Sequence, residues 1–144
     1  MIMAQISDTH LSPAGQKTCD VAPMAENLRR CVASINALTP KPDVVLLTGD
    51  VTHRYAFEEA EQAAEILAAL TMPLYVVPGN HDDRAVLASV FGPDQCRLAE
   101  TGFADFVVEG FPLRLIGLDT LDDGKAGGRF ETTQRNWLAA RLDE

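Results

Sequence analysis

The sequence of 144 residues lacks several features of secreted and membrane proteins. Its three cysteines, Cys19, Cys31 and Cys96, form no CxxC pair and leave one over, so we interpret them as packed or half-exposed thiols in a reducing compartment. The N-terminus has no basic region and reaches polar residues too early for a signal peptide. No apolar run approaches the roughly 20 residues needed to cross a bilayer. We therefore expect a cytoplasmic protein with no membrane partner.

Basic residues are also scarce, because 12 Lys and Arg stand against 21 Asp and Glu and give a formal net charge of −9. This balance disfavours a nucleic-acid polymer as partner, since such binding depends on Lys and Arg at the phosphates. An anionic membrane surface is disfavoured for the same reason. A small anion can still bind where metal cations reverse the local field. The length and the hydrophobic content of 47% predict one globular domain over residues 1–144.

Short apolar runs alternate with helical periodicity along the chain. We predict strands at residues 2–6, 44–47 and 74–77, with helices at 24–38 and 57–70 between them. Further on we predict a short helix at 83–91, an antiparallel pair of strands at 106–108 and 113–118, a Gly-rich loop at 122–128 and a helix at 133–142. The alternation of strand and helix predicts an α/β fold with a parallel sheet and right-handed crossovers.

The only three histidines, His10, His53 and His81, lie at or just past the ends of the first three predicted strands. Ligands bind at that edge of open α/β sheets, because the strand-to-helix loops converge there. Aspartate and asparagine side chains accompany the histidines in Asp8-Thr9-His10, Gly49-Asp50 and Gly79-Asn80-His81-Asp82. Mixed nitrogen and oxygen ligands from separate strands suit a divalent metal site.

Each motif taken singly has a simpler interpretation. Asp8 and His10 point to the same side of an extended segment, but a surface turn is the commoner context. Asp50 could bind a metal, accept a phosphoryl group or cap the next helix. The segment at residues 79–82 is more specific, because three polar side chains directly after a buried strand are unnecessary for folding. The weight therefore lies in the combination.

The three motifs in this order, each ending a strand with helices between them, resemble the calcineurin-like metallophosphoesterase superfamily. The chain is most similar to its cyclic-nucleotide and glycerophosphodiester phosphodiesterases, over essentially the whole length. The resemblance implies an α/β/β/α sandwich, of which this chain would form the N-terminal βαβαβ half with an incomplete second sheet. It also implies hydrolysis of small phosphodiesters, of the 3′,5′-cyclic nucleotide or glycerophosphodiester class, with two divalent ions (Mn, Fe, Zn or Co).

The resemblance also implies a role for each site residue. Asp50 would bridge both ions, Asp8 and His10 would complete the ligands of the first ion, and Asn80 would bind the second. Two ions about 3.5–4 Å apart would activate water for in-line attack and neutralise the phosphoryl oxygens. His81 matches the active-site histidine of the family, which contacts the phosphoryl group or the leaving oxygen and, if protonated, could stabilise the leaving alkoxide.

The sequence departs from the family pattern after His81, because the family supplies a later histidine and a Gly-His-x-His segment and this sequence has no further histidine. The second ion would keep only Asp50 and Asn80. We therefore expect an N-terminal portion of a longer enzyme with impaired activity. Uncovered sheet surface would favour association with a second copy.

Other polar residues near the motifs have simpler roles. For His53, where relatives carry a carboxylate or amide, we favour a place at the helix start over one facing substrate. Arg54 and Arg84 could contact a phosphate, but we favour the solvated surface for both. We expect Asp82 and Asp83 to cap the following helix.

Two other classes of protein remain as alternatives. The first is a non-catalytic metal-binding or interaction module of the same fold, which the missing histidines favour. The second is a phosphoacceptor receiver-like domain. Against it, Asp50 follows the second predicted strand and not the third, and Asp119-Thr120 at the end of the fifth strand has no lysine beside it.

Overall fold

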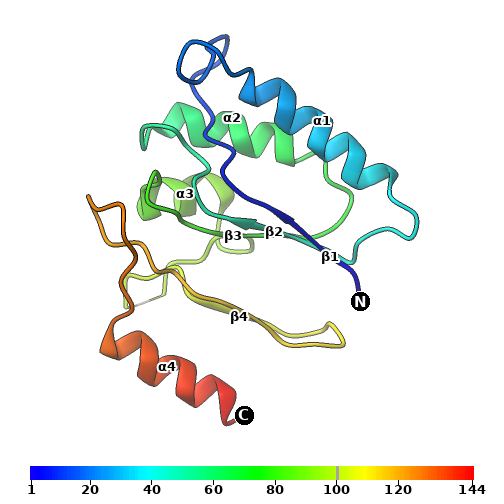
Figure 1. Ribbon diagram of the computed structural model, residues 1–144. Helices are drawn as coiled ribbons and strands as arrows, with labels where there is room; N and C mark the ends of the chain where they lie inside the picture. The colour runs from blue at the N-terminus through cyan, green and yellow to red at the C-terminus, as the bar shows by residue number, and fades with distance from the viewer. Residues whose placement is uncertain (100) are drawn as a thin grey trace.

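A parallel sheet forms the centre of the fold. The computed structural model describes residues 1–99 and 101–144, with β1 (Met3–Ile6), β2 (Val44–Thr48) and β3 (Leu74–Val77) paired in the order β1-β2-β3 (Figure 1). Both pairings are parallel, as predicted, and Leu47 lies opposite Val76 in the β2–β3 register. This order differs from the 2-1-3 order of flavodoxin-like sheets, which argues against a receiver-like domain.

One face of the sheet is covered by helices. Helices α1 (Met24–Ala37), α2 (Phe57–Leu67) and α3 (Arg84–Phe91) lie on the same side (Figure 1). For α1 and α2 this follows because right-handed crossovers between neighbouring parallel strands return on one face. Alternate strand residues meet them in a core that includes Ile6, Leu28, Val32, Leu47, Ala60, Ala63, Val76 and Leu87. Full burial of each large aliphatic side chain stabilises the fold by about 1.5–3 kcal/mol.

The opposite face of the sheet meets a smaller layer. Strands β4 (Phe106–Val108) and β5 (Leu115–Gly117) form an antiparallel pair, and α4 (Thr132–Leu142) lies beyond them (Figure 1). The rings of Tyr75 and Phe106, 5.7 Å apart, join the two sheets. Within the described residues the second sheet has only these two strands. The prediction of a four-layer α/β arrangement with an incomplete second sheet is therefore confirmed.

The end of α2 differs from its predicted position. The helix ends at Leu67 and not at residue 70, because Leu70 N–H turns back to the carbonyl of Leu67 at 3.0 Å. The side chain of Asn36 in α1 then donates to the carbonyl of Ala69 at 2.8 Å and accepts from the N–H of Thr71 at 3.1 Å. A side chain from a neighbouring helix thus binds the turn, and local periodicity carries no signal of it.

Arg84 lies between the two layers and not on the solvated surface, so that prediction was wrong. Its guanidinium contacts the fully buried carboxylate of Asp119 at 2.5 Å and that of Asp123 at 2.8 Å, and it also donates to the carbonyl of Leu121. Burial lowers the pKa of Arg84, but Asp119 and Asp123 together hold it above its ordinary value. The ion pair joins α3 to the segment after β5, and the Arg84 guanidinium also lies 5.3 Å from the ring centre of Phe103.

Asp105 continues this polar network into α4. Its carboxylate accepts from the N–H of Asp119 at 2.8 Å and from the side-chain amide of Gln134 at 3.1 Å. Burial raises the pKa of Asp105, and the charge of Asp119 adds to this effect, although the two hydrogen bonds oppose it.

We expect Asp105 to make the protein less stable as pH rises through its raised pKa. In the unfolded chain the carboxyl ionises at lower pH, so between the two pKa values the folded state binds more protons and its stability falls with increasing pH. Asp105→Asn should remove this component of the free energy of unfolding, measured in urea between about pH 3 and pH 7. Parallel pH profiles for the variant and the wild type would contradict the assignment.

The cysteines behave as isolated thiols. Cys19 is exposed, Cys31 is half-buried and Cys96 is buried, and all three are free. Burial, with Asp119 and Asp82 nearby, raises the pKa of Cys96 to about 12, so its thiol stays protonated. Within residues 1–99 and 101–144, every helix is too short or too polar to cross a membrane.

Candidate metal centre

The predicted site residues lie on three loops that leave the same edge of the sheet. Asp8 and His10 follow β1, Asp50 follows β2, and Asn80 and His81 follow β3. Pairing of the first two loops continues beyond the strands, because the N–H of His10 donates to the carbonyl of Asp50 at 2.9 Å. The backbone therefore places His10 directly beside Asp50.

Three of these residues have unusual backbone geometry. Asp8, His10 and Asp50 adopt the left-handed region, with φ of 57°, 40° and 53°. A left-handed backbone at a residue other than glycine costs about 1–3 kcal/mol of strain, and it persists only where the surrounding structure holds it. Such residues are concentrated at functional sites. Here the conformation turns each strand end sharply, so that the side chains meet at the edge of the sheet.

The side chains of these three residues form one cluster. The Nε2 atom of His10 lies 3.6 Å from Oδ2 of Asp50 and 3.8 Å from Oδ1 of Asp8. One ligand atom from each residue lies within 4.8 Å of one from each of the other two. Asp50 is largely buried, with 15% of its side chain exposed, whereas Asp8 is 67% exposed. The cluster thus opens to solvent on the side of Asp8.

His81 is fixed against this cluster. Its backbone N–H donates to Oδ1 of Asp50 at 3.0 Å, and its Nδ1 lies 2.9 Å from the carbonyl of His53. Because a carbonyl only accepts, Nδ1 carries the proton in this arrangement. Asn80, the preceding residue, is half-buried and lines a cavity of about 450 Å³ together with Thr48. The structure therefore brings Asp8, His10, Asp50 and His81 together and places Asn80 beside His81 on the loop after β3.

Comparison with known families agrees with this geometry. The family model for calcineurin-like phosphoesterases matches residues 1–139. The chain belongs to the calcineurin-like phosphoesterase family. This assignment confirms the resemblance seen in the motifs and removes the receiver-like alternative.

Curated relatives are phosphodiesterases by name. A probable glycerophosphodiester phosphodiesterase of Arcobacter nitrofigilis is 36% identical over 100% of this chain and 52% of its own length. A glycerophosphodiester phosphodiesterase of Enterobacter lignolyticus is 30% identical over 100% of this chain and 52% of its own. A probable cyclic nucleotide phosphodiesterase of Rhodococcus erythropolis is 32% identical over 97% of this chain and 46% of its own. The chain spans about half the length of the curated relatives it matches.

Calcineurin-like phosphoesterases use divalent metal ions, and the donor set of this member fits such an ion. Metal–ligand bonds of about 2.0–2.2 Å place neighbouring ligand atoms roughly 3–4 Å apart. The distances from His10 to Asp50 and Asp8 already lie in that range. Two carboxylates and one imidazole suit Mn²⁺, Fe²⁺, Co²⁺ or Zn²⁺.

Asp82 braces the site and does not cap α3, so this prediction was wrong. Asp83 alone takes the cap position, where its side chain accepts from the N–H of Val86 at 2.9 Å. The carboxylate of Asp82 is buried and accepts from the backbone N–H groups of Val51 (3.1 Å), Thr52 (2.8 Å) and Gly79 (2.9 Å). It therefore ties the loop after β2 to the loop after β3. Burial raises the pKa of Asp82, although these hydrogen bonds oppose the shift.

Glu59 is a second buried carboxylate, and it lies outside the sequence motifs. Its Oε2 accepts from the backbone N–H groups of His53 at 3.0 Å and Arg54 at 2.7 Å, and so holds the loop before α2. The signal in the sequence was its place in the first turn of a predicted helix, where a glutamate commonly reaches back to the preceding backbone. Arg54 itself is exposed, as predicted.

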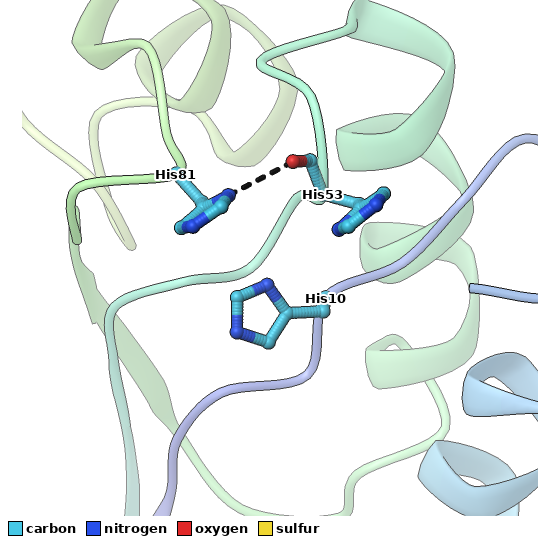
Figure 2. Close-up of side chains that lie close together, drawn as sticks. All are labelled: His10, His53 and His81. Carbon is cyan, nitrogen blue, oxygen red and sulfur yellow. Dashed lines mark hydrogen bonds between the residues drawn. The ribbon is translucent and has the colours of Figure 1, made fainter. Parts of the chain in front are cut away.

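The ring of His53 lies in the site, although we had favoured the helix start. Only its backbone contacts the start of α2, where the N–H of His53 donates to Oε2 of Glu59. Figure 2 shows its ring beside those of His10 and His81. The ring centroids of His53 and His81 lie 6.1 Å apart and the rings are nearly parallel, with an interplanar angle of 5°. The position facing the site, the less favoured of the two, is therefore the one observed.

We expect Gly49→Ala to destabilise the protein more than Gly15→Ala. Both glycines have positive φ, 89° and 83°, so both substitutions share the backbone strain of about 1 kcal/mol. A Cβ at Gly49 would lie 2.8 Å from Cα of Gly79, whereas one at Gly15 meets nothing within 4 Å. The clash should lower the free energy of unfolding of Gly49→Ala by about 1–3 kcal/mol more than that of Gly15→Ala, as measured in urea. Equal losses in both variants would contradict a close approach of the two loops.

Proposed function

We propose that this chain forms a divalent-metal site for the hydrolysis of phosphodiesters. Asp8, His10 and Asp50 would hold one ion, and Asp50 with Asn80 would contribute to a second. The proposal depends on one observation above all, that one ligand atom of each of the first three residues lies within 4.8 Å of the others. Mn²⁺, Fe²⁺, Zn²⁺ and Co²⁺ all suit this mixture of carboxylate and imidazole.

Bound ions at such a site activate water and neutralise charge on the phosphoryl oxygens. The residues of this chain would orient the reacting groups and transfer a proton. Oδ2 of Asp50 lies near Nε2 of His10, and Oδ1 of Asp50 accepts from the backbone N–H of His81. The carbonyl of His53 fixes the ring of His81 through Nδ1, which leaves Nε2 to exchange a proton with the leaving oxygen.

The substrate we propose is a small phosphodiester of the 3′,5′-cyclic nucleotide or glycerophosphodiester class. The names of the relatives, which include both kinds, support this class. A net charge of −9 leaves bound cations as the main attraction for an anionic ester.

A direct test measures Mn²⁺ binding by calorimetry together with hydrolysis of bis(p-nitrophenyl) phosphate. We expect about one tightly bound ion per chain and a weaker second one, because Asp50 and Asn80 are only two ligands. Hydrolysis should be slow and should require the metal. Absence of Mn²⁺ binding, or hydrolysis that survives chelation, would contradict the proposal.

A non-catalytic metal-binding module of the same fold is the second candidate. The observation that favours it is the small ligand set of the second ion, for which this chain offers Asp50 and Asn80. Metal binding without any turnover, for the cyclic nucleotide and glycerophosphodiester substrates alike, would favour this module over the enzyme.

A further inference from the structure

All three histidines of the sequence meet at one place. They come from the loops after β1, β2 and β3, and their rings surround a common space (Figure 2). One ring nitrogen of each lies within 4.8 Å of one ring nitrogen of each of the other two. The rings of His10 and His81 are closest, with centroids 4.8 Å apart and planes at 83°. The proposed phosphodiester chemistry uses the rings of His10 and His81 and has no role for the ring of His53.

Two nitrogens in this cluster have no partner. Among the side chains of residues 1–99 and 101–144, the buried atoms without a hydrogen-bond partner are Nδ1 of His10, Nδ1 of His53 and Nε of Arg141. An unpaired buried polar atom costs about 1–3 kcal/mol, and in native structures it often marks an ion or water. Two such imidazole nitrogens in one cluster are available as ligands for a cation.

We propose that His10, His53 and His81 form a second metal site, made of nitrogen ligands only, for an ion of the Zn²⁺ class. Imidazole suits Zn²⁺, Cu²⁺ and Ni²⁺, whereas carboxylate-rich sites suit Mn²⁺. Zinc–nitrogen bonds of about 2.0–2.1 Å place ligand nitrogens about 3.4 Å apart, so the rings must close by up to about 1.4 Å. To bind, His81 exchanges its contact with the carbonyl of His53 for the ion, or turns to present its other nitrogen.

The backbone of His53 favours this role. Its N–H is held by the carbonyl of Leu11 at 3.0 Å and by the carboxylate of Glu59 at 3.0 Å. The loop therefore stays in place whatever the side chain does. The thiol of Cys19 lies 3.9 Å from Nε2 of His53, on the other side of the ring from Nδ1.

His10 belongs to both sites through opposite nitrogens. Its Nε2 faces Asp8 and Asp50, whereas its Nδ1 is the unpaired atom in the histidine cluster. A neutral imidazole has one lone pair and one N–H, so it binds one ion at a time. Zn²⁺ in the histidine site should therefore weaken Mn²⁺ binding at the carboxylates. This competition rests on the proposed function, whereas the histidine site itself does not.

The test uses Cu²⁺ as a probe of the whole chain, with electron paramagnetic resonance to count the coupled nitrogens. We expect three nitrogens in the wild type and two in His53→Ala, with Cu²⁺ and Zn²⁺ affinity reduced more than tenfold. Changes in outer contacts alone shift metal affinity by about 10–100-fold, so loss of a ligand should cost at least as much. His53→Gln, which keeps a polar side chain, should give the same loss.

Matched variants separate this site from its neighbours. Tyr55→Ala removes an exposed ring that stacks parallel to His81 at 6.2 Å but offers no nitrogen, and Cys19→Ser removes the adjacent thiol. Both should bind Cu²⁺ as the wild type does. Asp8→Asn should weaken Mn²⁺ binding and keep the three-nitrogen signal. An unchanged nitrogen count in His53→Ala, or loss of that signal in Asp8→Asn, would overturn the proposal.

Discussion

Asp50→Asn is expected to abolish metal binding at the Asp8–His10–Asp50 cluster and to remove any phosphodiester hydrolysis. Asn keeps the size of the side chain and tolerates the left-handed backbone at φ 53°. It removes the negative charge that an ion at the Asp8–His10–Asp50 cluster would need. Outer contacts alone alter metal affinity by about 10–100-fold, so loss of a direct ligand should lower Mn²⁺ affinity more than about 100-fold. Calorimetric titration with Mn²⁺ measures the effect.

The control for this variant is Asp20→Asn. Asp20 has the same left-handed backbone, with φ of 61°, but is exposed on the loop before α1. The two substitutions therefore change charge and backbone preference equally. Mn²⁺ affinity and turnover should be unchanged in Asp20→Asn. Equal Mn²⁺ affinity in Asp50→Asn and the wild type would place the ion elsewhere and contradict the proposed centre.

The clustering of Asp8, His10 and Asp50 could be predicted from the sequence, because the parallel sheet brings its strand ends together. Apolar runs at residues 44–47 and 74–77 located two strands, and the polar residues after them then had to share one edge. The periodicity likewise gave α1 and α3 to within about one residue, which is good for such boundaries. Local patterns of about ten residues therefore located these elements, whereas the predicted end of α2 was three residues too late.

The contacts that connect distant segments could not be predicted in this way. Asp82 and Asp83 are identical neighbours before a helix, yet one caps α3 and the other binds three backbone N–H groups in the interior. The ring of His53 lies beside the rings of His10 and His81, which come from two other loops. Residue type and spacing are the same for both outcomes, and only the tertiary arrangement decides.

Asp119→Ala should cause the largest loss of stability among the substitutions considered. The carboxylate of Asp119 is fully buried and contacts the guanidinium of Arg84, whose side chain is only 13% exposed. It also accepts from the backbone N–H groups of Ala104 at 3.0 Å and Leu121 at 2.9 Å. Removing one partner of a buried ion pair leaves an uncompensated charge and costs about 3–5 kcal/mol. Urea unfolding measures this difference.

Asp123→Ala provides the comparison within the same network. Asp123 contacts the same guanidinium at 2.8 Å, but its side chain is 82% exposed. Because water screens exposed pairs, this variant should lose at most about 1 kcal/mol. The two variants thus remove the same charge from the same arginine and differ in burial. If they lost equal stability, the contact between α3 and the segment after β5 would be a surface pair, and it would not anchor the second layer to the parallel sheet.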